Sequence, residues 1–446
     1  MEHAAAIRQS PAAPRQGGRL GERLRQLRVA AGLTQTELAG DRFSKEYVSQ
    51  IERGKTRPTA ETVSWLAARL GVDPGFLTNG VSAEDRGRVE ATIARAEALL
   101  GAGSFPEAVT EFQSARAQLT NVPELEVTAL VGESRARIQT GGVRDALELL
   151  TNARTITEGP AFSDVERAEV LLWVGVCRYK LSSIQTALGL FNESLQLAER
   201  SGLPCDRVRA EIYSWRSRCY RRQRDFEAAR EDVEAALELA QGLGDRRALA
   251  NAYFLASIVA ERQGHWLLAR TYAERAKAQY EELADSANIG RLMNNLGGLQ
   301  VLLGKPETAV DYLTDAFRIA LDLGNDADAA QAVSSLAQVH LRAGELDRAE
   351  EQARHALTLL DGRVDFLDEI GNAQLTLGRA QLEQGRLDEA EATFALAESS
   401  FDQLSSASHR AAAWVAQGDL AARRGDDRRA AHLYRAAAEA LQDFRF

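Results

Sequence analysis

Most residue types that could carry catalysis occur in this 446-residue chain without the spacing that catalysis requires. Gly54-Lys55-Thr56 matches the end of a phosphate-binding loop, but Ser49 stands where such a loop needs its first glycine. The six histidines and three cysteines form no His-Glu-x-x-His or Cys-x-x-Cys pattern, which argues against a metal site. Acidic pairs such as Glu281-Glu282 are typical of solvated helix faces. We therefore expect no enzyme activity, no metal and no cofactor.

One short segment, residues 44–53, carries side chains suited to contact another macromolecule. Ser44 is typical of a helix N-cap, and at 100° per residue Val48 and Ile51 point to one side of the helix. The opposite face is polar, and such a stripe is often only a solvated surface. Here it follows a short helix and a tight turn, and that combination is the motif that docks in the major groove of DNA. The side chains on the polar face are Lys45, Glu46, Ser49, Gln50 and Arg53.

Four further helices are predicted around this segment, within residues 19–78. Leucines recur at three- and four-residue intervals from Leu20 and the pattern stops at Gly32, which predicts an amphipathic helix. Thr34 and Glu37 form a capping box for a short second helix. Pro58-Thr59 begins the helix after the polar one, and a last short helix starts with Pro74. The expected unit is a small bundle of five helices.

The capping, turn and apolar residues of this bundle form one continuous motif: Leu33, Thr34, Gln35, Glu37, Leu38, Ala39, Ser44, Val48, Ser49, Ile51, Glu52, Gly54, Pro58, Leu66, Ala67, Leu70, Gly71 and Val72. This motif resembles the Cro/C1-repressor (XRE) helix-turn-helix family across about 60 residues. The resemblance implies a lambda-repressor-like domain that binds double-stranded operator DNA.

The resemblance also implies a division of roles among the polar residues. Arg28 would pair with Glu52 inside the domain, which is a structural role. The residues that would hold DNA phosphates, close to helix ends, are Gln35, Lys55 and Arg57. The residues that would face the bases are Lys45, Glu46 and Gln50, and Ser49 would contact either bases or phosphates.

Two features depart from the family pattern. The turn between the second and third helices is about one residue shorter than usual and lacks its glycine. Phe43 is expected to pack where a smaller apolar residue usually sits, so the orientation of the polar helix does not follow from the resemblance. Trp65 falls on a face that is usually solvated, and it is either an isolated exposed aromatic residue or a docking point for the rest of the chain or a second copy.

Beyond residue 83 a short sequence motif, called here the turn phrase, recurs nine times. It consists of a turn residue, a usually apolar residue two positions later, and an alanine three positions after that. Apolar residues recur at three and four residues in Asn288–Leu303 and in Glu307–Leu323, which predicts a helix on each side of the turn. No such helix pair can bury its apolar stripe alone, so neighbouring pairs must stack. The alanines are 38 to 42 residues apart, at Ala108, Ala146, Ala187, Ala229, Ala269, Ala309, Ala349, Ala390 and Ala430.

Small residues stand near the middle of five of the first helices: Gly175, Gly297, Ala337, Gly378 and Gly418. Together with the turn phrase, they resemble the tetratricopeptide (TPR) family over about residues 84–440. The implied fold is a right-handed TPR-like α-solenoid of about nine helix pairs. The repeat length of about 40 residues exceeds the 34 residues of the TPR family and implies longer helices. HEAT repeats are also about 40 residues long, but the alanine of the turn phrase favours TPR repeats.

In stacked TPR pairs the first helix of each repeat lines a concave groove, and here the inward positions are polar and cationic. Arginine binds carboxylates and phosphates through two parallel hydrogen bonds, and asparagine amides clamp an extended peptide backbone. The alternative is that these arginines pair with acidic residues of neighbouring repeats. The predicted lining residues are Arg135, Tyr179, Lys180, Arg218, Arg221, Arg222, Asn251, Arg262, Arg291, Asn294, Gln338, Arg342, Asn372 and Arg379.

The expected domain order is a disordered arm at 1–18, the helix-turn-helix domain at 19–78, a linker at 79–83 and the repeats at 84–446. Ser82 and Asp85 are suited to cap the first repeat helix. Residues 1–80 hold 12 Lys+Arg against 8 Asp+Glu, and the remainder holds 42 against 56, which argues against nucleic-acid binding along the whole length. No apolar run approaches a membrane span, and we expect a cytoplasmic protein.

The complete layout resembles the peptide-responsive RRNPP regulators, most closely the NprR-like members. That resemblance implies a homodimer that binds promoters through its N-terminal domain and changes the curvature of its array when a short peptide binds. We therefore predict a transcriptional regulator with a short peptide, a small anionic ligand or a protein partner in its groove. The alternative is an interaction adaptor that controls a protein partner, with DNA binding secondary.

Overall fold

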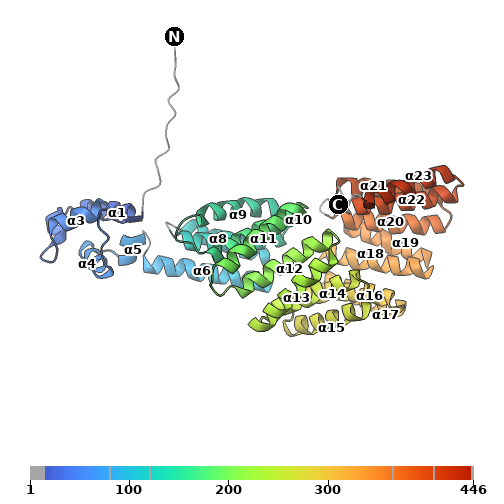
Figure 1. Cartoon of the computed structure of the whole chain (residues 1–446), viewed down its shortest axis with the longest axis horizontal. Coiled ribbons are helices and arrows are strands. Elements are labelled where there is room, and N and C mark those ends of the chain that lie inside the picture. The colour runs from blue at the N-terminus through green and yellow to red at the C-terminus, as the bar shows by residue number, and fades with distance from the viewer. Residues whose placement is uncertain (1–15, 80–81, 120–121, 364–365, 405–406, 443–446) are drawn as a thin grey trace, which may run out of the picture. The chain divides into compact units, whose positions relative to one another are not determined.

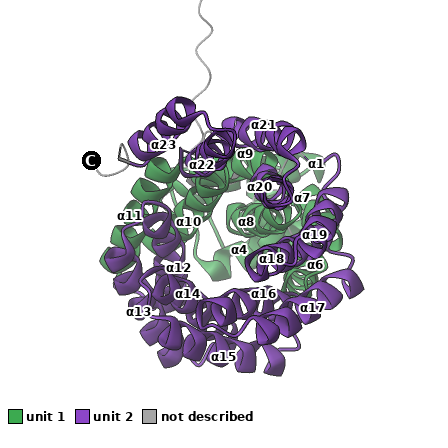
Figure 2. Cartoon of the chain, turned by 90° about the vertical axis from the view of Figure 1, so that its right-hand side faces the viewer, with its two compact units in different colours: residues 1–201 green, residues 202–446 purple. Residues whose placement is uncertain are grey.

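The computed structural model describes residues 16–79, 82–119, 122–363, 366–404 and 407–442, and Figure 1 labels most of its helices. No strand occurs within these ranges, which confirms the all-α prediction. The chain divides into two compact units, residues 1–201 and 202–446 (Figure 2). The first unit holds helices α1–α11, and the second holds α12–α23.

Five helices form the N-terminal domain. The side chains of Thr34, Ser44 and Thr59 each accept a hydrogen bond from a backbone N–H three residues later, and Glu37 completes the predicted capping box with Thr34. Residues 16–18 are helical rather than part of an N-terminal arm, whereas residues 1–15 lie outside the described ranges. The helices are α1 Gln16–Ala30, α2 Gln35–Ala39, α3 Lys45–Glu52, α4 Ala60–Leu70 and α5 Pro74–Asn79.

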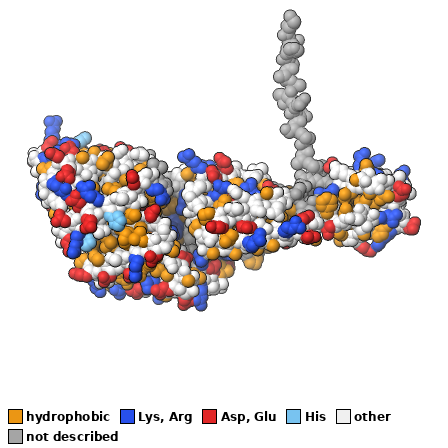
Figure 3. All heavy atoms as spheres, turned by 180° about the vertical axis from the view of Figure 1, so that it is seen from behind, with side chains coloured by type: hydrophobic (Ala, Val, Ile, Leu, Met, Phe, Trp, Pro, Cys, Tyr) orange, Lys and Arg blue, Asp and Glu red, His pale blue; other side chains and the backbone are white. Residues whose placement is uncertain are grey.

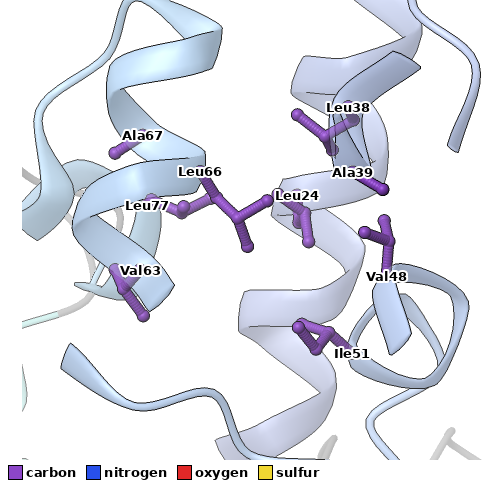
Figure 4. Close-up of a cluster of buried hydrophobic side chains, with 9 residues drawn as sticks. All are labelled: Leu24, Leu38, Ala39, Val48, Ile51, Val63, Leu66, Ala67 and Leu77. Atoms are coloured by element: carbon purple, nitrogen blue, oxygen red, sulfur yellow. The ribbon is translucent and has the colours of Figure 1, made fainter. Parts of the chain in front are cut away.

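All five helices contribute buried apolar side chains to the core of this domain (Figure 4). Gly21 lies where α1 crosses the end of α3, and any Cβ at this position would collide with the backbone oxygen of Ile51. Glycine therefore permits the close contact that fixes α3 against α1. The core residues are Leu24, Leu38, Ala39, Val48, Ile51, Val63, Leu66, Ala67 and Leu77.

In the described ranges, the helices after α5 form nine antiparallel pairs, which confirms the predicted TPR-like solenoid. Ser82 caps the first of them, as predicted, by accepting a hydrogen bond from the N–H of Asp85 at 3.0 Å. In the first unit the pairs are α6 Ala83–Ala102 with α7 Phe105–Gln118, α8 Pro123–Gln139 with α9 Val143–Thr157, and α10 Asp164–Lys180 with α11 Ile184–Arg200.

The second unit contains six pairs. They are α12 Asp206–Arg222 with α13 Phe226–Leu243, α14 Arg246–Arg262 with α15 Trp266–Glu282, α16 Ser286–Leu302 with α17 Pro306–Asp322, α18 Asp326–Ala343 with α19 Leu346–Leu359, α20 Leu367–Glu383 with α21 Leu387–Gln403, and α22 Ala407–Arg423 with α23 Asp427–Gln442. Among the described helices none is long and apolar enough to cross a membrane.

Small residues allow the two helices of a repeat to pack closely. The alanines of the turn phrase are fully buried from Ala108 to Ala390, and Ala430 is nearly so. A side chain at Gly378 would collide with the ring of Phe394 in the following helix. First helices of neighbouring repeats also contact one another, and in the second unit α14, α16 and α18 lie inside α13, α15 and α17 (Figure 2). The first helices therefore line the inner surface of this unit.

Candidate functional site

The polar face of α3 points away from the domain core. Val48 and Ile51 are buried beneath it, whereas Lys45, Glu46 and Gln50 are exposed, and Ser49 is half-buried. Ser44 fixes the start of the helix by accepting a hydrogen bond from the N–H of Tyr47 at 3.2 Å. This arrangement presents the first two turns of α3 to a partner, as a groove-binding helix requires.

The segment after α3 carries two exposed cations, Lys55 and Arg57. Neither they nor Lys45 form an ion pair with a carboxylate of the described residues. The Thr56 hydroxyl donates a hydrogen bond to Gln50 Oε1 at 3.0 Å, which fixes the side chain and leaves its amide N–H groups for another acceptor. The two charges after α3 that are predicted to hold phosphates are thus exposed and have no ion-pair partner among the described residues.

The predicted Arg28–Glu52 pair is confirmed and lies inside the domain. Arg28 donates to both Glu52 carboxylate oxygens, at 2.6 and 3.2 Å, and to the Leu33 carbonyl at 2.8 Å. The hydrogen bond to Glu52 raises the pKa of the Arg28 guanidinium. Gln35 Nε2 also donates to Glu52, at 2.8 Å, so this amide nitrogen is engaged inside the domain and is not available to a phosphate in this conformation.

Trp65 has a structural role that differs from both sequence-based interpretations. Its ring packs edge-on against Phe43 with ring centres 5.1 Å apart, and Phe43 in turn lies 5.3 Å from Tyr47 of α3. The Arg69 guanidinium stacks over Trp65 and donates to the Glu37 carbonyl at the end of α2. The short turn between α2 and α3 is therefore supported by an aromatic contact from α4.

In the second unit, first helices of four repeats end in arginine at matching positions. Arg222 and Arg262 are the last residues of α12 and α14, Arg342 is the penultimate residue of α18, and Arg423 is the last residue of α22. Matching positions of stacked repeats lie along one edge of the inner surface. This edge of the groove is consequently rich in guanidinium groups.

Some predicted groove residues are engaged by neighbouring side chains. Arg291 donates to Asp328 of the next repeat at 2.9 Å, and Arg135 in the first unit pairs with Glu97 at 3.4 Å. The Tyr280 hydroxyl donates to Asn251 Oδ1 at 2.6 Å, and burial raises the pKa of this tyrosine. For Arg135 and Arg291 the pairing alternative is therefore correct. Basic and acidic side chains are intermixed on the face shown in Figure 3, as such pairing requires.

Other predicted groove residues have different surroundings. Arg218 stacks over the Trp215 ring at 4.8 Å, and Arg222 is exposed. Arg221 Nε and Asn294 Oδ1 are buried without a hydrogen-bond partner in the described residues. Tyr179 and Lys180 lie on α10 of the first unit, half-buried and exposed respectively. The remaining residues carry no side-chain bond or ion pair to a described residue, and these are Arg262, Gln338, Arg342, Asn372 and Arg379.

Comparison with known proteins identifies the N-terminal domain. The helix-turn-helix domain family matches residues 19–76, and the tetratricopeptide repeat family matches residues 208–282, 258–322 and 288–361. The uncharacterised HTH-type transcriptional regulator y4dJ of Sinorhizobium fredii is 44% identical over 54 residues, which are 12% of this chain and 70% of y4dJ. The chain belongs to the HTH-type transcriptional regulators.

A second relative of this regulator is the HTH-type transcriptional regulator DdrOP3 of Deinococcus deserti. It is 42% identical over 64 residues, which are 14% of this chain, and the chain spans about half the length of DdrOP3. Both alignments have about the length of the helix-turn-helix match. The helix-turn-helix similarity therefore covers residues 19–76, and the repeats are identified by the tetratricopeptide match and by structural comparison.

The regulator's repeat array is similar in fold to two solved proteins. The alignment with Rap protein, solved in complex with Competence and Sporulation Factor, covers 80% of this chain and 98% of the Rap chain. The TM-score is 0.61 and the sequence identity is 17%. NprR, a quorum sensor of B. thuringiensis, aligns over 79% of this chain and 99% of its own in the apo form, with a TM-score of 0.57 and 13% identity. NprR has also been solved with its cognate peptide NprX. These similarities show that the regulator shares the fold of Rap and NprR.

Proposed function

We propose that this regulator binds operator DNA through α3 and that occupation of its repeat groove by a short peptide or small anionic ligand changes operator affinity. The DNA-binding part of the proposal rests on three exposed cations at and after α3 that have no ion-pair partner among the described residues: Lys45, Lys55 and Arg57. The cations supply phosphate anchoring, and the polar face of the helix supplies base readout. One such domain covers a half-site, so the proposal includes a homodimer on half-sites about 34 Å apart or a multiple of that.

The array supports the sensing part of the proposal. It exposes an inner surface with unpaired arginine and amide side chains, and its fold is that of NprR, which binds the peptide NprX. Within each unit a repeat contacts mainly its neighbours, so small rotations at the interfaces accumulate along the stacked pairs of that unit. A ligand that prefers one curvature would therefore shift the array toward it, and DNA must then change ligand affinity by the same factor.

Substitutions in and after α3 separate base readout from phosphate anchoring. We expect Gln50→Ala to reduce the preference for the operator over random duplex by about 1–3 kcal/mol, because it removes a base contact. Lys55→Ala should instead weaken binding to all duplexes by a similar factor and lower the salt slope by about one. Fluorescence anisotropy with operator and random duplexes measures both quantities.

Arg318→Ala, on an outer helix of the array, serves as the control and should bind both duplexes like the wild type. An unchanged operator-to-random affinity ratio in Gln50→Ala would show that α3 is placed differently on DNA. Absence of duplex binding by the wild-type protein would favour the interaction adaptor instead.

A hydrogen-bonded connection joins the DNA-binding domain to the first repeat. Asp73 Oδ1 accepts from the N–H of Phe76 in α5 at 3.0 Å and from the N–H of Ala83, the first residue of α6, at 3.2 Å. Arg23 of α1 donates to the carbonyl oxygens of Leu77 and Thr78 at the other end of α5. Movement of α6 is therefore transmitted through α5 to α1, against which α3 packs.

We expect Asp73→Ala to loosen this connection without changing the DNA-contacting surface. Loss of a capping carboxylate costs about 1 kcal/mol, so amide exchange at Phe76 and Ala83 should accelerate about fivefold. Affinity for a single half-site should stay constant, because Asp73 lies outside α3. Hydrogen exchange and half-site titration check both expectations, with the exposed Asp41→Ala as control, and unchanged exchange would show that Asp73 does not link the helices.

A further inference from the structure

The second unit contains a hollow of about 670 Å³ on the inner side of its last three repeats. Its walls come from α18, α20, α22 and α23, and they include the apolar side chains of Leu341, Leu382 and Ala422. Arg342 and Arg379 also line it. A volume of this size accommodates a terminal segment of a peptide or a small organic molecule.

The charges around the hollow are not balanced. Arg423 donates to Glu383 at 2.8 Å, and the Tyr434 hydroxyl donates to Asp419 at 2.8 Å, a bond that raises the pKa of the tyrosine. Glu383 is thus paired with a cation, whereas Asp419 accepts only from a neutral hydroxyl and keeps its negative charge. The lining therefore carries three arginines and two carboxylates, and the two arginines without an ion-pair partner come from neighbouring repeats.

Arg342 and Arg379 are both exposed, and neither forms an ion pair or a side-chain hydrogen bond with a described residue. Each guanidinium presents five donors in a planar fork that matches the two oxygens of a carboxylate. Elsewhere in the array several arginines pair with an acidic residue of a neighbouring repeat, as Arg291 does with Asp328 and Arg424 with Glu391. At this hollow, two arginines of neighbouring repeats therefore have no carboxylate partner among the described residues.

We infer that this hollow binds the C-terminal carboxylate of a short peptide, with Arg342 and Arg379 on the carboxylate and a terminal apolar side chain against Leu341, Leu382 and Ala422. The inference rests on the function proposed above, and it assigns the C-terminus of the peptide to this hollow in the groove. The apolar part of the lining favours a carboxylate attached to an apolar residue over a bare inorganic anion, which would leave that surface exposed to water.

The carboxylate would also connect α18 to α20 directly, because one guanidinium comes from each helix. Two charge-assisted hydrogen-bonding groups on a shared anion hold neighbouring repeats at one spacing. Binding at this position therefore biases the curvature of the array, which is the change that the proposed regulation requires.

The test uses the full-length protein and a mixed heptapeptide pool ending in leucine, prepared once as free acids and once as C-terminal amides. We expect the wild type to retain the free-acid pool about tenfold more strongly than the amide pool, measured by mass spectrometry of bound peptides, since hydrogen bonds between charged groups carry this preference. Arg342→Gln and Arg379→Gln should each reduce the preference severalfold. Arg318→Gln, an exposed arginine on outer helix α17, should leave it unchanged.

Equal retention of acids and amides by the wild type, or an undiminished preference in Arg379→Gln, would overturn the inference. Displacement of the peptides by inorganic phosphate with no acid preference would assign the hollow to phosphate and overturn it as well. Anisotropy with the selected operator duplex is recorded on the same samples. If peptides change operator affinity but acids and amides are retained equally, this inference fails while the proposed function still holds. Thermal melts of each variant check that it is folded.

Discussion

Replacement of Arg28 by methionine is expected to unfold the DNA-binding domain while the repeats stay folded. The side chain of Glu52 is only 3% exposed, and Arg28 supplies two of the three hydrogen bonds that its carboxylate receives from side chains. Loss of one partner of a buried ion pair leaves an uncompensated charge and costs about 3–5 kcal/mol. A domain of about 60 residues has little stability beyond that amount. Hydrogen exchange should show loss of protection across α1–α5 with the array protected as in the wild type.

The double variant Arg28→Met with Glu52→Met distinguishes the buried charge from simple loss of packing. It removes both charges and should recover most of the stability, because matched apolar replacements of buried pairs are often neutral. If the double variant is as unstable as Arg28→Met, the stability effect comes from lost packing or from the Leu33 contact rather than from the unpaired carboxylate.

Phe394→Ala is expected to unfold the last repeats and to abolish ligand binding at the hollow beside them. Phe394 is fully buried in α21, and its ring packs directly against Gly378 of α20, next to Arg379. Truncation of a buried phenylalanine costs about 3–5 kcal/mol through lost transfer energy and the cavity that remains. Since repeats depend on their neighbours, protection from hydrogen exchange should fall across α20–α23 and fade toward α12.

Leu396→Ala provides the matched control on the same helix, because Leu396 is 58% exposed. It should leave exchange protection and peptide retention within error of the wild type. Uniform loss of protection over the whole second unit in Phe394→Ala would show that the unit unfolds as a single cooperative block, contrary to the expected gradient.

Local sequence signals predicted much of the fold. Thr34, Ser44 and Ser82 were identified as helix caps from residue type and spacing, and each accepts the expected hydrogen bond. The 40-residue period of buried alanines predicted the stacked pairs, because a turn residue and a small residue at fixed spacing specify each unit. The Arg28–Glu52 pair followed from the helix-turn-helix resemblance. These features depend on short spacing or on a recurrent motif, which a single sequence displays directly.

Features that depend on distant partners could not be predicted in the same way. Trp65 packs on Phe43, 22 positions earlier, because the shortened turn places that ring beside α4. Arg291 is neutralised by Asp328, 37 positions later, whereas Arg342 has no such partner among the described residues. The sequence shows arginines at similar positions in several repeats but does not show which acidic side chain reaches each one. The distinction between engaged and available cations therefore required the structure.

We propose that the N-terminal domain anchors the protein to operator DNA through phosphate contacts. The most direct measurement is the affinity of the full-length protein for a duplex selected from genomic fragments, determined between 50 and 200 mM salt beside a scrambled duplex. We expect preference for the selected duplex at every salt concentration. We also expect a decrease in affinity of about a thousandfold over this range if about six phosphates are contacted. Absence of binding at 50 mM salt, or equal affinity for the scrambled duplex throughout, would contradict the claim.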